Sequence, residues 1–298
     1  MAYFNPQAAL ASTRLDHLIL NGNLVSADLT NSITSATINR TITQASTVKL
    51  VVADYSRDFL RSPICNQASR VQVGALGFVL VQVAKSGNQL TLTCEDAVIN
   101  RLRGIRGART QAPGVRTRVQ FAAQLCAEAG VPFIGDFDTP AATEPLSRGT
   151  TQTPNEDTWT CLTRIAGVVG YRCFSDGINV LFGPDAWLLN PVGPSSGPGL
   201  LVDELSDRVD WVNFDYDVGK SGAKATVFTY ADFWTSDPGA PSTIRNLGPG
   251  SGQWLIESIG RNLNRAATTV ALVAGQPSLP EPPPPATGGA HQVSFTAH

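Results

Sequence analysis

The segment from residue 153 to 184 constrains the fold more than any other part of the chain. After the possible helix N-caps Asn155 and Asp157, apolar side chains recur at the spacing of one helix face. These apolar residues are Trp159, Leu162, Ile165, Ala166 and Val169. Gly170 follows, at a position where helices commonly end in a left-handed turn. The pattern predicts a helix over residues 156–169.

A β-hairpin is predicted directly after this helix. Two apolar runs flank Asp176-Gly177, a dipeptide typical of tight hairpin turns, so the hairpin is expected over residues 171–182. A second helix is expected over residues 116–129, where apolar side chains again fall on one face. Two helices and a hairpin are too small to bury a core alone, and we expect them to pack on a larger unit.

Short strand patterns separated by turn residues fill residues 16–104. The run TVKLVVA at 47–53 is apolar enough for a buried strand, and Ser-Gly-Asn at 86–88 joins two further strands. Strands at this spacing predict a small antiparallel β-barrel or sandwich. Asp96 can cap a short helix over 97–102, which is expected to plug one end of the barrel.

A second strand-rich region begins near residue 201. Residues 207–218 alternate between apolar and polar side chains, and further strand patterns occur at 225–233, 254–259 and 268–273. We expect a second small β-domain of similar length to the first, so that the two β-units repeat an architecture although their sequences do not visibly repeat.

The predicted fold class is therefore mainly β with an α+β insert: two small antiparallel β-barrels joined by a helix-plus-hairpin middle region. An N-terminal arm occupies residues 1–15 and the first barrel 16–104. The α+β insert occupies 105–200, the second barrel 201–274 and a proline-rich C-terminal tail 275–298.

The residues needed for most catalytic or metal chemistry are scarce. The only histidines are His17, His291 and His298, which leaves almost no basis for a catalytic triad or a histidine metal site. The five cysteines include no C-x-x-C pair, and buried free thiols are expected. Gly193 to Gly197 matches G-x-S-x-G but sits among prolines, without the strand and helix that this motif needs. We expect no enzyme activity, no cofactor and no metal.

Arginines form the one pronounced charge cluster, because no acidic residue occurs between Asp96 and Glu128. The candidate residues for a basic loop that lines a lumen or contacts another subunit are Arg101, Arg103, Arg106 and Arg109. A loop that binds nucleic acid is the alternative. The cluster contains no aromatic residue to stack on bases, and the net charge of −2 gives no general attraction to nucleic acid.

Two further expectations concern surfaces. A candidate interface loop is rich in glycine and proline and consists of Asn246, Leu247, Gly248, Pro249 and Gly250. The sequence has no signal peptide pattern, and no apolar stretch approaches the roughly 18 residues of a membrane span. We expect synthesis in the cytoplasm and no membrane span.

The chain resembles the baseplate hub, or tail-tip, proteins of long-tailed phages, particularly phages of actinomycetes. The likeness is carried by ATINRTITQASTVKLVVADYSRDFL at 36–60 and LTLTCEDAVINRLRG at 90–104. It continues in NEDTWTCLTRIAGVVGYRCFSDGINVLFGP at 155–184 and in NLGPGSGQWLIESIGRNL at 246–263, followed by ATTVALVAGQPSLPEP. These motifs occur in a consistent order over residues ~15 to 285.

The resemblance implies a homotrimeric structural virion protein at the distal end of a tail. Three copies, each with two tail-tube-like barrels, would form a pseudo-sixfold ring around the DNA-exit channel. The implied partners are further copies of the chain, the distal tail protein or tail tube, the end of the tape-measure protein and a receptor-binding tip protein. DNA would pass without sequence-specific binding. The alternative is a tail protein that binds or hydrolyses envelope glycans, with Trp234 and Asp215 as candidate residues.

Overall fold

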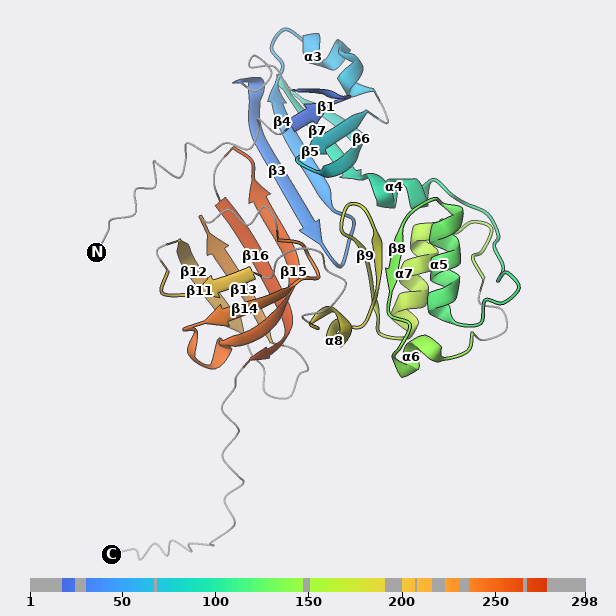
Figure 1. Ribbon diagram of the computed structural model, residues 1–298. Coiled ribbons are helices and arrows are strands. Elements are labelled where there is room, and N and C mark those ends of the chain that lie inside the picture. Colours follow the sequence, from blue (N-terminus) through green and yellow to red (C-terminus); the bar gives the residue numbers. More distant parts are fainter. Residues whose placement is uncertain are drawn as a thin grey trace, which may run out of the picture.

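The computed structural model describes residues 18–24, 31–66, 69–146, 151–190, 200–206, 208–215, 223–230, 236–264 and 267–277. Their strands form a 13-stranded sheet and a 3-stranded sheet, and the longer helices lie beside the smaller sheet (Figure 1). The predicted N-terminal arm lies outside the described residues, as does the proline-rich tail beyond residue 277. Residues 275–277 are the end of a strand, although the sequence predicted the start of the tail there.

The first β-unit contains seven strands in the order β3-β4-β7-β6-β5-β1-β2, and every pairing among them is antiparallel. The strands are β1 (Leu18–Leu20), β2 (Asn23–Leu24), β3 (Ile33–Thr41), β4 (Thr47–Ala53), β5 (Arg70–Val73), β6 (Leu76–Ser86) and β7 (Gln89–Asp96). Between β4 and β5 lie α3 (Asp58–Arg61) and the 3₁₀ turn η2 (Pro63–Cys65). Alternating residues of β4, including Val48, Leu50 and Val52, point into a common core, as the sequence predicted.

The second β-unit contains six strands. They are β11 (Leu200–Asp203), β12 (Val209–Asp215), β13 (Lys224–Thr229), β14 (Pro241–Arg245), β15 (Gly252–Asn262) and β16 (Ala267–Pro277), with the 3₁₀ turn η3 (Gly248–Gly250) between β14 and β15. The order β12-β13-β16-β15 is antiparallel; β14 also pairs with β15, and β11 pairs in parallel with β14. The core of this unit surrounds Trp254.

The two β-units belong to one continuous sheet, so the prediction of two separate barrels is not confirmed. β3 pairs with β4 along one edge and with β15 along the other, from Ser258↔Thr41 to Asn262↔Thr37. Both hydrogen-bonding edges of β3 are thus occupied, and the strand bridges the units instead of closing a barrel within the first one. Each unit still has its own hydrophobic core.

The middle region is a small α/β unit. Its sheet has the order β8-β10-β9 and is formed by β8 (Phe133–Gly135), β9 (Arg172–Ser175) and β10 (Val180–Gly183). Its helices are α4 (Ala97–Arg103), α5 (Arg118–Glu128), α6 (Pro140–Thr143), α7 (Thr158–Val168) and α8 (Asp185–Leu188). The helices α5 and α7 and the β9–β10 hairpin lie where the apolar spacing predicted them. For strand β8 and helix α6 the sequence analysis predicted no element.

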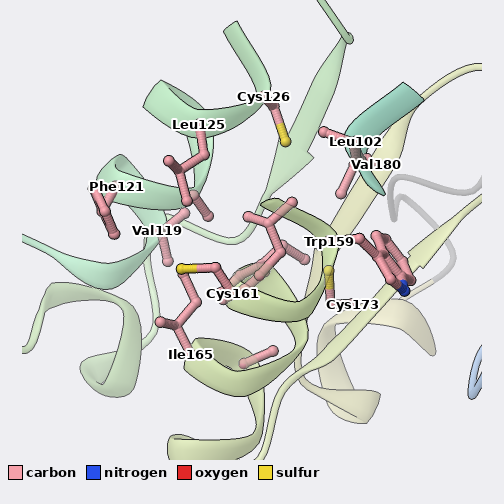
Figure 2. Packing of buried hydrophobic residues seen from close by; sticks show 14 of the residues in the cluster. Leu102, Val119, Phe121, Leu125, Cys126, Trp159, Cys161, Ile165, Cys173 and Val180 are labelled. Atoms are coloured by element: carbon pink, nitrogen blue, oxygen red, sulfur yellow. The ribbon is translucent and has the colours of Figure 1, made fainter. Parts of the chain in front are cut away.

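The core of the middle region is built mainly from α5, α7 and the hairpin, and Figure 2 shows its packing, with Trp159 at one side of the cluster. Ile99 and Leu102 of α4 join this core. Helix α4 therefore buries Ile99 and Leu102 in the core of the middle region, although it also contacts β6 and β7 of the first β-unit. That it plugs one end of the first β-unit stays a prediction. Cys126, Cys161 and Cys173 are free thiols in the same core, which confirms the expectation for these three cysteines.

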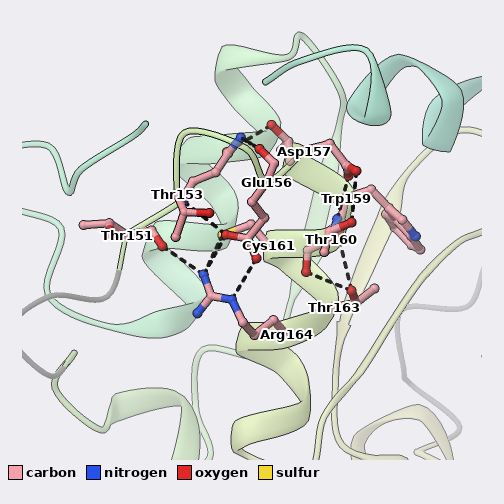
Figure 3. Close-up of polar contacts among 11 residues, drawn as sticks. Thr151, Thr153, Glu156, Asp157, Trp159, Thr160, Cys161, Thr163 and Arg164 are labelled. Atoms are coloured by element: carbon pink, nitrogen blue, oxygen red, sulfur yellow. Dashed lines mark hydrogen bonds and ion pairs between the residues drawn. The ribbon is translucent and has the colours of Figure 1, made fainter. Parts of the chain in front are cut away.

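Local side-chain contacts explain where the two longer helices begin. At α7 the Asp157 carboxylate accepts a hydrogen bond from the Thr160 amide at 2.8 Å, which makes Asp157 the N-cap. Arg164, two turns further on, donates to both carboxylate oxygens of Glu156 and to the Thr151 carbonyl, so the preceding loop is tied to the helix (Figure 3). Helix α5 begins with a capping box between Thr117 and Gln120.

Candidate assembly site

A buried arginine occupies the place where the two β-units and the middle region meet. Arg40 of β3 is 3% exposed, and its guanidinium forms an ion pair with Asp237 at 2.5 Å. It also donates to the Asp176 carbonyl in the β9–β10 turn at 2.9 Å and to the Ser236 carbonyl at 3.3 Å. One side chain of the first β-unit thus binds backbone from the middle region and an acid just before β14.

Asp96 adds a second buried polar group at this junction. Its carboxylate accepts the Val98 and Ile99 amides and so caps α4, and it also hydrogen-bonds Ser175 of β9. Burial raises the pKa of Asp96, while these hydrogen bonds and nearby Arg40 oppose the rise. The N-cap role of Asp96 was predicted from the sequence.

The junction arginine was missed by the sequence analysis, although a signal existed. In β3 the side chains of Ala36, Ile38 and Arg40 are all buried and alternate with more exposed neighbours. A charged residue in phase with a buried apolar series must find a partner inside the protein. The burial of Arg40 could therefore be predicted from its position in the alternating series. Its partner could not be predicted, because Asp237 lies 197 positions away in the sequence.

Acids from other segments neutralise part of the arginine cluster. Arg103 forms an ion pair with Glu95. Arg109 pairs with Glu128 at 2.7 Å, and Arg118 pairs with Glu144 at 2.7 Å. The sequence showed no acid within the cluster, but folding brings acids to it from both sides. Exposed Arg101 and Arg106 have no ion pair within the described part of the chain.

The residues of the predicted interface loop close one end of the second core. The Trp254 indole N–H donates to the Gly250 carbonyl at 3.0 Å, and the partly buried Leu247 packs against the core of the second β-unit. Asn246 adopts a left-handed conformation with φ of 63° and donates to the Asp203 carboxylate at 2.7 Å. The loop therefore has a structural role and also holds the turn that follows β11.

A cleft of about 620 Å³ opens between the first β-unit and the middle region. Its apolar lining comes from β6, α4 and the loop before β8, and includes Phe78, Val98 and Val131. Arg101 also lines it, beside the cationic side chain of Arg70. A second hollow shares Arg70 and continues across the strands β1 and β5.

The described residues include no group of three or more histidine, cysteine, aspartate or glutamate side chains that could hold a metal ion. Burial raises the pKa of Cys94 and Cys126 to about 12 and that of Cys161 to about 11, which suppresses the nucleophilic thiolate. Among these residues no helix has the length and apolar character needed to cross a membrane.

Comparison with known proteins identifies the fold. No protein-family model and no curated protein sequence matches the chain. Among solved structures, the 43 kDa tail protein of prophage MuSo2 from Shewanella oneidensis superposes with a TM-score of 0.57 and 13% identity, over 86% of this chain and 96% of that chain. A tail protein from Neisseria meningitidis MC58 gives 0.55 and 12%, over 86% and 95%. The fold is that of phage tail proteins.

A secretion-system protein shares this fold as well. The Escherichia coli c3393 protein gives a TM-score of 0.58 at 14% identity, over 87% of this chain and 76% of that chain. It is described as a component of the type VI secretion system with structural similarity to the T4 bacteriophage tail proteins gp27 and gp5. At such low identity the comparisons establish the architecture, while the roles of individual residues rest on the geometry above.

Proposed function

We propose that this chain is a structural protein of a phage virion, a trimeric hub at the distal end of the tail. The observation that carries the proposal is the fold shared with the MuSo2 and Neisseria tail proteins over nearly their whole length.

The arrangement of the β-units supports a ring. Two β-units, each with a separate core, lie in one sheet and are held together by β3, β15 and the Arg40 junction. Three chains would then supply six β-units in a closed pseudo-sixfold ring. In this arrangement one face of the ring receives the distal tail protein or tail tube and the end of the tape-measure protein. The other face carries the receptor-binding tip, and DNA leaves through the centre.

The basic loop takes a limited part in this proposal. Since Arg103 and Arg109 are ion-paired within the chain, we assign a subunit contact to the unpaired Arg101 and Arg106 in place of tight DNA binding. DNA retention at low salt by the purified protein would favour the nucleic-acid alternative, and an unchanged elution across salt concentrations would remove it. The affinity to actinomycete phages stays a prediction.

The test is the oligomeric state together with the place of the protein in the particle. Mass photometry of the full chain over a concentration series should give a species of three subunits, and micrographs should show rings. Antibody labelling of virions should mark the end of the tail. A protein that stays monomeric at high concentration and is missing from purified particles would refute the proposal.

One observation keeps the glycan-binding alternative open to test. Trp211 on β12 is 40% exposed and stacks on Phe228 with ring centroids 5.7 Å apart, and an exposed aromatic face of this kind can bind a sugar ring. Asp215 is exposed at the end of β12, and Trp234 lies outside the described residues. Blank results on a glycan array and in a cell-wall turbidity assay would eliminate this alternative.

A further inference from the structure

The turn after β11 presents the exposed apolar side chain of Leu205 next to the carboxylate of Glu204. Leu205 is 79% exposed, and Leu201 on β11 is 54% exposed. Glu204, between the strand and Leu205, has no ion pair within the described residues. We call residues 203–206 the Leu205 knob. A large apolar side chain at such exposure is unusual beside a carboxylate that remains available to a cation.

The knob is held rigidly in its projecting conformation. The Asp203 carboxylate accepts the Leu205 amide at 3.1 Å and the Asn246 side-chain amide at 2.7 Å. These hydrogen bonds lower the pKa of Asp203, with Asn246 as the largest cause. The Glu204 amide donates to the Arg245 carbonyl at 3.2 Å. A preorganised turn loses little conformational entropy when it binds.

The 620 Å³ cleft has the complementary properties. Its lining is apolar around Phe78 and Val98, and it carries the cations Arg70 and Arg101, which have no ion pair among the described residues. Ile178 at the tip of the β9–β10 hairpin is 59% exposed and lines the same cleft. The tip is fixed, because the Asp176 carboxylate accepts the Ile178 and Asn179 amides at 2.8 and 2.7 Å.

We propose that the Leu205 knob of one copy of this chain occupies the cleft of the next copy. Leu205 would pack on the apolar lining, and Glu204 would pair with Arg101 and Arg70. The proposal rests on the trimeric function above and assigns its subunit contact. It would also give the candidate interface loop an indirect part in assembly, since Asn246 hydrogen-bonds Asp203 of the knob.

The placement of the two surfaces fits a ring. Figure 1 shows β11 in the second β-unit at the left of the view, whereas α4, which lines the cleft, lies between the first β-unit and the middle region. A contact between two different surfaces of a subunit is heterologous, and such contacts close into a ring when the rotation between neighbours is 120°. The occupant we assign is therefore a second copy rather than a different protein.

The first experiment measures trimer dissociation of the full chain by mass photometry. Leu205→Asp should raise the protein concentration at which trimers dissociate at least tenfold. Tyr55→Asp is the matched control, because Tyr55 is also 79% exposed but lies in the first β-unit away from both surfaces. Trimers of Leu205→Asp that are as stable as those of Tyr55→Asp would overturn the proposal and leave the trimeric hub intact.

A charge exchange tests the specific pairing. Glu204→Arg and Arg101→Glu should each weaken the trimer, and the double variant should recover a large part of the loss because the pair is restored with opposite polarity. Combining Glu204→Arg with Arg61→Glu, an exposed arginine on α3, should give no recovery. Equal recovery in both double variants would refute the assigned contact.

A cross-linking experiment identifies the occupant of the cleft directly. Because Cys65 is a free and partly exposed thiol, the variants are made in a Cys65→Ser background. In that background a chain with both Leu205→Cys and Ile178→Cys should yield covalent dimers and trimers with a short bismaleimide, whereas either single variant should remain monomeric on a denaturing gel. Trimers by mass photometry without cross-linked products in the double variant would refute the knob contact alone. A wild-type chain with no self-association would instead refute the trimeric hub, so the two failures are distinguishable.

Discussion

The Arg40 junction gives the most decisive prediction about stability. Arg40→Met keeps much of the side-chain volume but removes the ion pair with Asp237 and the hydrogen bonds to two backbone carbonyls. Breaking a buried ion pair by removing one partner costs roughly 3–5 kcal/mol, because the remaining charge is left without compensation. Asp237 is 20% exposed and keeps some solvation, so we expect a value near the lower limit, about 3 kcal/mol.

The measurement is urea denaturation monitored by tryptophan fluorescence. Trp254 reports on the second β-unit and Trp159 on the middle region, so loss of the junction should also separate transitions that coincide in the wild type. The double variant Arg40→Met/Asp237→Leu should be more stable than Arg40→Met alone, since it leaves no unpaired acid at that position.

Arg109→Met is the matched control. It removes the same type of side chain from an ion pair with Glu128 in which both partners are accessible to solvent, with exposed fractions of 26% and 40%. Pairs of this kind contribute about 0–1 kcal/mol. A loss on Arg40→Met no larger than the loss on Arg109→Met, with coincident transitions, would refute the view that Arg40 joins the three units.

Three further predictions test local features. Asp96→Ala should lose about 1 kcal/mol through loss of the α4 N-cap, whereas Asp96→Asn keeps the cap. Burial raises the native pKa of Asp96, so its contribution to stability is complete below the unfolded-state pKa of about 4 and is lost as pH rises through the native pKa. The urea midpoint of the wild type minus that of Asp96→Asn should therefore decrease as pH rises from about 4. Gly239→Ala should destabilise by about 1–3 kcal/mol, because its Cβ would lie 2.3 Å from the Phe174 ring, and Gly22→Ala, at the same φ of 83° in open space, should cost clearly less by thermal melting. An Ellman titration of native protein at pH 8 should react rapidly only with Cys65, the one cysteine that is not fully buried, and rapid reaction of two or more thiols would contradict the described core.

Periodicity made the local elements predictable. The apolar face of α7 and the turn dipeptide of the β9–β10 hairpin are encoded in consecutive residues, and the structure has both at the expected places. β8 escaped prediction because it has only three residues and gains its order from pairing with β10. A strand this short carries no readable period.

The ion-pair partners of the arginines could not be predicted from the sequence, because they are distant along the chain. Nothing near Arg109 or Arg118 indicates that Glu128 and Glu144 will neutralise them, because those ion pairs depend on how α5 and α6 pack. The basic cluster therefore looked more available to a partner than it is. The candidate loop at 246–250 was recognised by composition, but its contact with Asp203 and the adjoining Leu205 knob became visible only in the fold.

The largest difference from expectation, one sheet in place of two barrels, has a single cause in β3. Its backbone offers two edges, and pairing with β15 uses the edge that a closed first barrel would need. The same strand points Arg40 toward the middle region and toward Asp237, so backbone pairing and a buried ion pair fix the β-units at one relative angle. In a ring of three copies the angle between neighbouring β-units must be set twice, once within each chain and once between chains. β3 sets the first angle within the chain, and the proposed knob-and-cleft contact would set the second between chains. Arg40→Met should therefore impair closure of the ring even though the Leu205 contact is unchanged.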